Sequence, residues 1–402
     1  MYNIRNITDE IIWVGASDRR LALFENIFPV PRGVSYNAYV LLDEKTVLLD
    51  TVDAAVGAQF FENVGKALDG RKLDYLVVNH MEPDHCAMIG DIVRRYPEVK
   101  VVGNAKTFGM MQQFFCTDFS ESSVVVKEGD TLKTGGHTLH FVMAPMVHWP
   151  EAMVTYDETD KVLFSADGFG TFGALNGNIF ADEIDFDRDW LDDARRYYTN
   201  IVGKYGASVQ ALLKKAAGLE IKIICPLHGP IWRENLGYIL DKYQKWSTYV
   251  AEEQAVVILY ASMYGNTAAA ADALAGCMAE KGIKKIAVYD VSNTHVSELI
   301  GEIFRASHLV FATPTYNGGM YPVMENLFSD MKALSVQNKT IALVENGTWA
   351  PSTIRQMSQK LSEMKNMKVL EPQLSIKSAL HESQRGELEA LAEAVASSIL
   401  NA

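Results

Sequence analysis

The sequence predicts an α/β protein of two domains, in which a sandwich of two sheets with helices outside it is followed by an open parallel sheet. Three observations support this prediction. The chain has 402 residues, which is more than one hydrophobic core usually holds. Its first part has short apolar strands in runs, whereas its second part alternates strands and helices strictly. The two rhythms meet near residue 250, in the polar stretch before "AVVILYA".

The first domain, residues 1–250, begins with three short strands in "IIWVGA", "YNAYVLLD" and "TVLLDT". A helix over residues 55–69 follows and ends at Gly70, and the strand "DYLVVN" comes next. Residues 122–144 and 153–167 read as hairpin-like runs, because Gly and Asp clusters mark turns between their apolar segments. Strands grouped in this way, with helices outside them, predict two sheets that face each other.

The second domain, residues 254–402, repeats a simpler unit. Each of the strands "VVILYA", "KIAVYD", "HLVFAT" and "KTIALVEN" is followed by a helix. This βαβ rhythm is typical of an open parallel sheet, and such sheets bind ligands at the carboxyl ends of their strands.

Composition narrows the function and the compartment. The formal charge of -13 repels both a phosphate backbone and an anionic membrane, so we expect neither nucleic acid nor a membrane as a partner. The start of the chain lacks the pattern of a signal peptide, and no stretch approaches about 18 uncharged apolar residues. Four scattered cysteines without a C-x-x-C pair fit a reducing cytoplasm; they are Cys86, Cys116, Cys225 and Cys277.

The stretch "HMEPDH" places His80, Glu82, Asp84 and His85 directly after an apolar strand. Three further polar residues also stand just past apolar strands, and all have Gly or Pro nearby; they are His148, Asp167 and His228. Loops after neighbouring strands converge on one edge of a sheet, so these seven residues are predicted to share a site. A polar turn at "HMEPDH" is the simpler alternative.

Four imidazoles and three carboxylates exceed what one tetrahedral ion can use, so two ions bridged by a carboxylate are implied. Nitrogen and oxygen ligands without thiolate suit iron or manganese better than a structural zinc ion. The other four histidines that lie in turns, strands or helix edges are expected to be structural; they are His137, His140, His295 and His308. Cys86 and Cys225 are expected to be small buried residues.

This set of residues resembles the metal-ligand pattern of the metallo-β-lactamase superfamily, and specifically its flavodiiron branch. The intervals of 62, 18 and 60 residues between His85, His148, Asp167 and His228 agree with that family. Hydrolases of the superfamily typically have a second His where this chain has Glu82, and an anionic oxygen there favours iron. The resemblance implies that His80, Glu82 and His148 hold one iron and that Asp84, His85 and His228 hold the other. Asp167 would bridge them. In some members the counterpart of His85 is turned away from the metal.

The second domain offers three loops at one edge of its sheet. "SMYGNT" lies between a strand and a helix, where hydroxyls, a Gly and free backbone N–H groups suit a phosphate monoester; a plain turn is the alternative. "TPTYNGG" and "NGTWA" follow the third and fourth strands. The trio resembles flavodoxin, in which such loops bind FMN, and Tyr316 and Trp349 are the candidates for contact with the flavin ring. The predicted FMN-binding residues are Ser262, Met263, Tyr264, Gly265, Asn266 and Thr267 in the first loop, Thr313, Pro314, Thr315, Tyr316, Asn317, Gly318 and Gly319 in the second, and Asn346, Gly347, Thr348, Trp349 and Ala350 in the third.

The combined layout, a metallo-β-lactamase-like αββα sandwich followed by a flavodoxin-like doubly wound sheet, resembles the two-domain flavodiiron proteins. The resemblance implies two non-haem iron ions, FMN, and reduction of O2 to water, of NO to nitrous oxide, or of both. A reduced FMN and a diferrous site together supply the four electrons that O2 needs. The resemblance also implies an external donor, either rubredoxin or a reduced deazaflavin, and a head-to-tail homodimer or a dimer of dimers.

Two residues near the irons are suggested by the same resemblance. Trp149 is adjacent to His148, and Tyr197 matches a tyrosine that the family commonly has close to the irons. Tyr198 is expected to serve packing. Some members carry a His near the gas pocket in the segment that matches "LFEN", but here that segment has Glu25 and Asn26, so no such role is carried over.

Two other hypotheses remain open at this point. A dizinc hydrolase with an appended flavodoxin domain would show zinc and turnover of thioesters or lactams. A flavodoxin-type electron carrier with a structural first domain would hold FMN, contain little metal and consume no O2. Metal and flavin analysis followed by exposure of the reduced protein to O2 and NO distinguishes all three. The preference for O2 or NO does not follow from these motifs.

Overall fold

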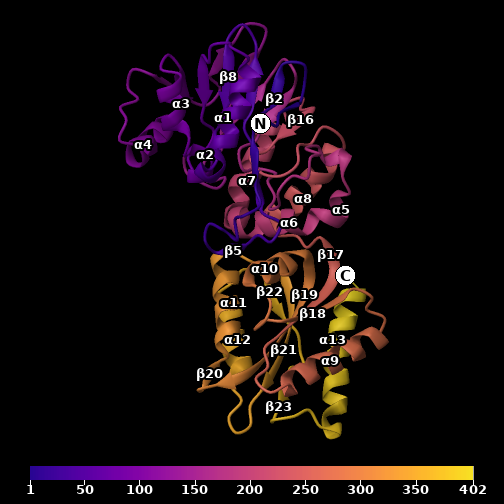
Figure 1. The fold of residues 1–402 in the computed structure, drawn as a ribbon. Helices are drawn as coiled ribbons and strands as arrows, with labels where there is room; N and C mark the ends of the chain where they lie inside the picture. Colours follow the sequence, from indigo (N-terminus) through magenta and orange to yellow (C-terminus); the bar gives the residue numbers. More distant parts are fainter. Residues whose placement is uncertain (402) are drawn as a thin grey trace. The chain divides into compact units, whose positions relative to one another are not determined.

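A computed structural model describes residues 1–401 of the chain, and these divide into two compact units, Met1–Tyr243 and Gln244–Ala402. Figure 1 shows the fold of each. Within residues 1–401, none of the helices combines the length and the apolar character that crossing a membrane requires. The predicted boundary at residues 250–254 stays a prediction.

The first unit contains the two predicted sheets. One sheet has the strand order β1-β2-β7-β8-β9-β10-β11, and the other has the order β12-β13-β14-β15-β16. The strands of the first sheet are β1 (Arg5–Asn6), β2 (Ile11–Trp13), β7 (Tyr39–Leu42), β8 (Thr46–Leu49), β9 (Tyr75–Val77), β10 (Lys100–Gly103) and β11 (Ser123–Val125). Those of the second are β12 (Thr131–Lys133), β13 (Thr138–Met143), β14 (Met153–Asp157), β15 (Val162–Phe164) and β16 (Ile223–Cys225). Two short ribbons pair β3 (Ala16–Asp18) with β6 (Val34–Tyr36) and β4 (Leu23–Phe24) with β5 (Phe28–Pro29).

The helices of the first unit lie between these strands in the chain. They are η1 (Ala54–Val56), α1 (Gly57–Leu68), α2 (Pro83–Cys86), α3 (Ile89–Arg95), α4 (Ala105–Phe114), η2 (Ala181–Glu183), α5 (Phe186–Asp189), α6 (Leu191–Tyr197), η3 (Tyr198–Val202), η4 (Gly203–Tyr205) and α7 (Gly206–Ala216), and α8 (Leu236–Thr248) contains the boundary between the units. The helix predicted over residues 55–69 is confirmed as η1 and α1. Its buried face carries Phe60, Val64, Ala67 and Leu68, the spacing of an amphipathic helix. Asp69 and Gly70, both at positive φ, end it.

One sequence interpretation is wrong in part. Residues 122–144 form only one hairpin, between β12 and β13, whereas β11 pairs in parallel with β10 in the first sheet. The residues between β11 and β12 pass from one sheet to the other: the N–H of Val126 donates to Gly103, and that of Gly129 to Phe141. Gly129 has a φ of +79°, a backbone turn that suits glycine.

Asn79 ties the two sheets together next to the predicted metal ligands. It follows β9 of the first sheet, and its carbonyl accepts a hydrogen bond from the Met153 N–H of β14 (3.0 Å). Its side-chain oxygen also accepts from the Thr155 hydroxyl (2.7 Å), while its own amide donates to Asp50 after β8 (2.8 Å). All of these groups are buried. The ends of both sheets are therefore held against each other where His80 begins its loop.

The second unit is the predicted doubly wound sheet. The order β18-β17-β19-β21-β22 is parallel throughout, β23 also pairs in parallel with β21, and β20 turns back on β19. The strands are β17 (Glu253–Tyr260), β18 (Ile286–Asp290), β19 (Ala306–Tyr316), β20 (Gly319–Met320), β21 (Lys339–Asn346), β22 (Met367–Val369) and β23 (Leu374–Ile376). The helices are α9 (Asn266–Glu280), α10 (Val296–Arg305), α11 (Pro322–Ala333), α12 (Thr353–Ser362), η5 (Glu382–Gln384) and α13 (Arg385–Leu400).

Alternate residues of β17 feed two separate cores. Val257 and Leu259 pack with the helices α10, α11 and α12 on one face, and Val256 and Ile258 pack with α9 and α13 on the other. Figure 1 shows these two groups of helices on either side of the sheet. A strand buried on both faces reads as a continuous apolar run, as "AVVILYA" does.

Candidate metal centre and ligand pocket

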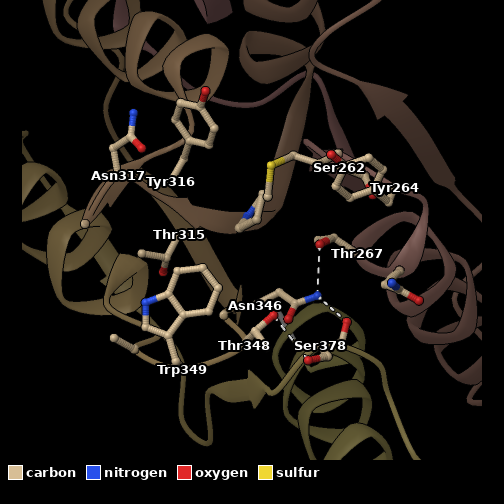
Figure 2. A pocket seen from close by; sticks show the side chains of 16 residues that line it. Ser262, Tyr264, Thr267, Thr315, Tyr316, Asn317, Asn346, Thr348, Trp349 and Ser378 are labelled. Carbon is tan, nitrogen blue, oxygen red and sulfur yellow. Dashed lines mark hydrogen bonds between the residues drawn. The ribbon is translucent and has the colours of Figure 1, made fainter.

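A cavity of about 510 Å³ lies at the carboxyl ends of the parallel strands in the second unit. Its walls come from the three predicted loops and from Ser378, which follows β23 (Figure 2). The lining residues are Ser262, Met263, Tyr264, Asn266, Thr267, Pro314, Thr315, Tyr316, Asn317, Gly318, Asn346, Gly347, Thr348, Trp349, Ala350 and Ser378. Three residues predicted to bind the cofactor do not line it: Gly265, Thr313 and Gly319.

The first loop is built as a turn into a helix. The N–H of Gly265 donates to the Ser262 hydroxyl (3.1 Å), and Gly265 has a φ of +91°. The helix α9 begins at the next residue, so the first N–H groups of this 15-residue helix have no partner in the preceding turn. Such groups bind phosphate readily. Gly265 therefore shapes the site without lining it.

The rim of the cavity carries two exposed aromatic rings. Tyr264 is 92% exposed and Trp349 is 90% exposed, and Figure 2 shows them on opposite sides of the cavity. No lining side chain carries a formal charge. Sequence reasoning missed Ser378, because it follows the short strand β23 and not one of the four long strands. The "LSIKSA" pattern, a strand followed by a small polar residue, was the available signal.

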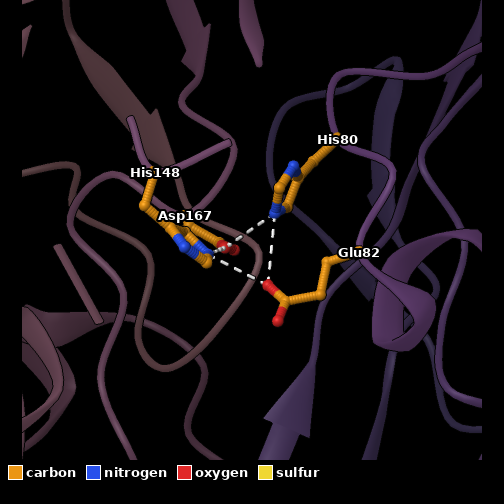
Figure 3. Close-up of side chains that lie close together, drawn as sticks. All are labelled: His80, Glu82, His148 and Asp167. Atoms are coloured by element: carbon orange, nitrogen blue, oxygen red, sulfur yellow. Dashed lines mark hydrogen bonds and ion pairs between the residues drawn. The ribbon is translucent and has the colours of Figure 1, made fainter. Parts of the chain in front are cut away.

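The structure brings all seven predicted metal ligands together in the first unit. One group consists of His80, Glu82, His148 and Asp167, whose ligand atoms all lie within 4.8 Å of one another (Figure 3). Nε2 of His148 is 3.0 Å from Oε2 of Glu82 and 3.1 Å from Oδ2 of Asp167. Nε2 of His80 lies 3.2 Å from the same Asp167 oxygen.

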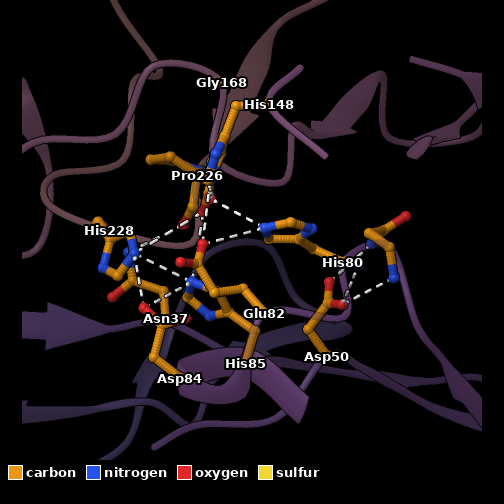
Figure 4. A network of polar contacts seen from close by, with 12 residues as sticks. Asn37, Asp50, His80, Glu82, Asp84, His85, His148, Gly168, Pro226 and His228 are labelled. Atoms are coloured by element: carbon orange, nitrogen blue, oxygen red, sulfur yellow. Dashed lines mark hydrogen bonds and ion pairs between the residues drawn. The ribbon is translucent and has the colours of Figure 1, made fainter. Parts of the chain in front are cut away.

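The second group, Asp84, His85 and His228, lies on the other side of Asp167 (Figure 4). Oδ1 of Asp167 is 3.3 Å from Nε2 of His85 and 3.7 Å from Nε2 of His228. Oδ2 of Asp84 is within 3.3 Å of both of these nitrogens. Asp167 thus directs one oxygen to each group, as a bridging carboxylate does. His85 points into the cluster and not away from it.

Two buried groups orient the imidazole rings. Nδ1 of His80 is 2.9 Å from Oε1 of Glu151, which also accepts from the Met81 N–H (2.8 Å). Nδ1 of His228 donates to the carbonyl of Ser35 (2.8 Å). Each contact leaves Nε2 as the nitrogen that faces the cluster, which is the usual support for a metal-binding His. Sequence reasoning missed both; Glu151, three residues after His148, was the more visible signal.

The donor set fits metal ions better than it fits itself. Both oxygens of Asp84 and Oδ1 of Asp167 are buried and accept no hydrogen bond of good geometry, and Nε2 of His85 and His228 lie only 3.0 Å apart. Buried polar atoms are normally satisfied, so these atoms need a partner that the polypeptide does not supply. Two cations, one in each group and both touching Asp167, satisfy all of them.

The electrostatics of the cluster show the same need for cations. Burial alone would lower the pKa of His148, but hydrogen bonds to Asp167 and Glu82 raise it to about 9. Burial alone would raise the pKa of Glu82, but His148 and His80 hold it below its ordinary value. Without metal the carboxylates therefore draw protons onto the imidazoles, and metal binding must release those protons.

Aromatic rings surround the cluster. Tyr197 is fully buried, its ring lies 5.4 Å from that of His228, and its hydroxyl has no hydrogen-bond partner within residues 1–401. The ring of Trp149 lies 5.5 Å from His80 in an edge-to-face arrangement. Phe24 packs against His228 at 5.4 Å. Tyr198 packs on Tyr243 instead, in agreement with its predicted packing role.

Glu25 is a further carboxyl group beside the cluster. It lies in the turn between β4 and β5 at a φ of +50°. The residue is exposed overall, but its carboxyl group shares a hydrogen bond with Glu82; burial and then this contact raise its pKa to about 8. The "LFEN" segment thus brings an acid, not an imidazole, to this position.

The remaining candidates have structural roles or none that the structure assigns. His137, Asp157 and Asp160 form a third group of potential ligands, but both ring nitrogens of His137 are already engaged, by Asp157 (2.9 Å) and Glu10 (2.6 Å). Cys86 and Cys225 are buried and belong to none of the three groups.

Comparison with known proteins agrees with both sites. Residues 34–229 match the family model described as ODP family beta lactamase, and residues 258–391 match the Flavodoxin model. Over 374 residues the chain is 30% identical to the anaerobic nitric oxide reductase flavorubredoxin of Klebsiella pneumoniae, covering 89% of this chain and 74% of the relative. The chain belongs to the flavodiiron protein family.

Solved structures of flavodiiron proteins share the fold over the whole chain. The rubredoxin oxygen:oxidoreductase from the anaerobe Desulfovibrio gigas is 28% identical and covers 99% of both chains with a TM-score of 0.91. The flavodiiron protein from Giardia intestinalis has the same fold, with a TM-score of 0.93, 24% identity, and coverage of 100% of this chain and 98% of its own. This flavodiiron protein is an oxidoreductase, as its named relatives are.

Proposed function

We propose that this protein reduces O2 to water, NO to nitrous oxide, or both, at two non-haem iron ions, with electrons that reach the irons through FMN. The observation that supports this most strongly is the position of Asp167 between two ligand groups, one of which contains Glu82. His80, Glu82 and His148 would hold one ion, and Asp84, His85 and His228 the other. The irons and FMN, when bound, supply two electrons each and, at iron, open positions for a small gas.

The surrounding residues prepare this site. Glu82 contributes an anionic oxygen where hydrolases have a neutral nitrogen, and this charge favours iron over zinc. Glu151 and Ser35 fix the orientations of His80 and His228. The rings of Phe24 and Tyr197 cover the cluster and exclude water. A buried apolar wall of this kind admits small uncharged gases.

Two residues at the cluster can assist the reaction. The hydroxyl of Tyr197 lies close enough to Asp167, Glu82 and Asp84 for their charges to raise its pKa further, after burial, so it stays protonated as a hydrogen-bond donor. Trp149 packs against the rings of both His80 and His148 and supports their positions.

We further propose that electrons come from an external rubredoxin-type donor, with a reduced deazaflavin as the alternative. The relatives named as flavorubredoxin and rubredoxin oxygen:oxidoreductase support the first donor. No C-x-x-C pair is present in these 402 residues to carry a rubredoxin iron. A cytoplasmic location and a head-to-tail homodimer, alone or paired into a dimer of dimers, complete the proposal.

One experiment tests the proposal against its alternatives. The purified protein is analysed for iron, zinc and FMN, reduced without oxygen, and then exposed to O2 and to NO in parallel. We expect two iron ions and one FMN per chain, together with consumption of at least one gas. A protein with zinc and thioester or lactam turnover would instead be a hydrolase. Bound FMN with little metal and no gas consumption would indicate an electron carrier.

A further inference from the structure

Asn346 connects three parts of the ligand cavity. It ends β21 and is buried, and its Nδ2 atom donates to the Thr267 hydroxyl (3.3 Å) and to the carbonyl of Ser378 (3.0 Å), as Figure 2 shows. A backbone carbonyl can only accept a hydrogen bond, so the contact with Ser378 fixes which side of the amide is nitrogen. Both protons of Nδ2 are then used, one for each partner.

This orientation determines the polarity of the Thr267 hydroxyl. Oγ1 accepts a proton from Asn346, so its own proton must point elsewhere. Within residues 1–401 it reaches no protein acceptor. Thr267 is 2% exposed, stands in the first turn of α9 and lines the cavity. Its hydroxyl proton is therefore available to a ligand of the cavity and to nothing else.

The neutral lining makes that proton important. No lining side chain carries a charge, so an anion in the cavity is held only by hydroxyl and amide donors and by the backbone at the start of α9. A hydroxyl that donates to an anion stabilises it, whereas one whose proton points away presents a lone pair and repels it.

We propose that Asn346 is a positioning residue for phosphate: it sets the Thr267 hydroxyl so that its proton faces the phosphate of the flavin. Ser378 holds Asn346 in this orientation. The inference rests on the proposed binding of FMN and adds the reason why the phosphorylated flavin would be selected over riboflavin, which lacks the phosphate.

Two substitutions separate this role from simple packing. Asn346→Asp keeps the size of the side chain but can only accept, so the Thr267 hydroxyl would turn its proton toward the new carboxylate and away from the cavity. Asn346→Ala removes the donor and leaves that hydroxyl free to turn. Thr267→Val removes the hydroxyl at almost the same volume.

The measurement is the ratio of the dissociation constants for riboflavin and FMN. The full chain, stripped of flavin, is titrated with each compound, and binding is followed by flavin fluorescence. One hydrogen bond to a charged group corresponds to about 10- to 100-fold in affinity, so Thr267→Val and Asn346→Asp should lower the ratio by about tenfold or more. Riboflavin affinity should change little. In the Thr267→Val background, Asn346→Ala should have no further effect on the ratio.

A charge control and the opposing outcomes complete the test. Asn317→Asp places the same charge in the same cavity, across from Thr267 in Figure 2, and should lower the ratio less than Asn346→Asp does. If the Asn346 variants weaken FMN and riboflavin equally, the residue only packs the loops and the inference is overturned. If the unsubstituted chain binds neither flavin, the proposed function itself fails. An additive effect of the Thr267 and Asn346 changes would also refute the coupling.

Discussion

Replacing Glu151 by Gln changes the charge beside His80 without changing the shape of the side chain. Glu151 has no exposed side-chain surface, and its Oε1 atom accepts from both His80 and Met81. The Gln oxygen can accept both bonds. A hydrogen bond to a charged group contributes about 1.5–3 kcal/mol and one to a neutral group about 0.5–1.5 kcal/mol, so the substitution weakens the support of His80 by about 1–1.5 kcal/mol. This corresponds to roughly a tenfold loss of affinity for the ion on His80.

The assay is anaerobic competition for Fe²⁺ against a chelator of known affinity, with FMN content as an internal standard. We expect the weaker of two iron-binding steps in Glu151→Gln to shift by about tenfold, with FMN unchanged. Glu158→Gln is the matched control, because Glu158 also accepts from a His, His140 (2.8 Å), but lies exposed and outside the cluster. Unchanged iron affinity in Glu151→Gln, or an equal loss in both variants, would refute the argument that Glu151 acts through His80.

Four further predictions follow from named contacts. Asp167→Ala should lose both irons and keep FMN, by metal and flavin analysis; full iron occupancy would exclude the bridge. Glu82→His should raise the ratio of zinc to iron in protein grown with both metals, and an unchanged ratio would contradict the role given to this carboxylate. In Gly229→Ala the new Cβ, at a φ of +74°, would lie 2.0 Å from Cγ2 of Thr171, so thermal unfolding should show a loss of about 1–3 kcal/mol that Thr171→Ser partly restores. Burial alone would lower the pKa of His137, but its two carboxylate partners raise it above 6.5. Its stabilisation is therefore complete below about pH 6.5 and is lost as pH rises through the higher pKa of the folded state, and His137→Gln should remove this part of the pH dependence of unfolding.

The periodic elements were predictable from local pattern. The alternating strands and helices after residue 254 appear as β17 to α13, because each strand is buried on both faces and therefore reads as an unbroken apolar run. The stretch 122–144 was harder. Its first strand, β11, has the same local appearance as β12 and β13 but pairs with β10, since the choice of partner strand depends on the sheet into which the chain folds.

The candidate ligands were also predictable, because each stands at the end of an apolar strand and such ends converge. Their supporting groups were not. Glu151 and Ser35 contact His80 and His228 across 71 and 193 positions of the chain, and neither residue type is distinctive in its own segment. Likewise Ser378 enters the ligand cavity from a short strand whose place beside β21 only the sheet establishes.

By itself, the sequence determined which chemical groups are available: seven nitrogen and oxygen donors with a carboxylate at position 82, and three polar loops after parallel strands. Those properties reside in residue type and in the local period of apolar residues, so they can be read without a fold. Only the tertiary structure decided how the groups are oriented. Asp167 directs one oxygen to each ligand group, His85 turns inward, and the amide of Asn346 sets the hydroxyl of Thr267. Orientation depends on partners far away in the chain, and those partners meet only when the sheets pack.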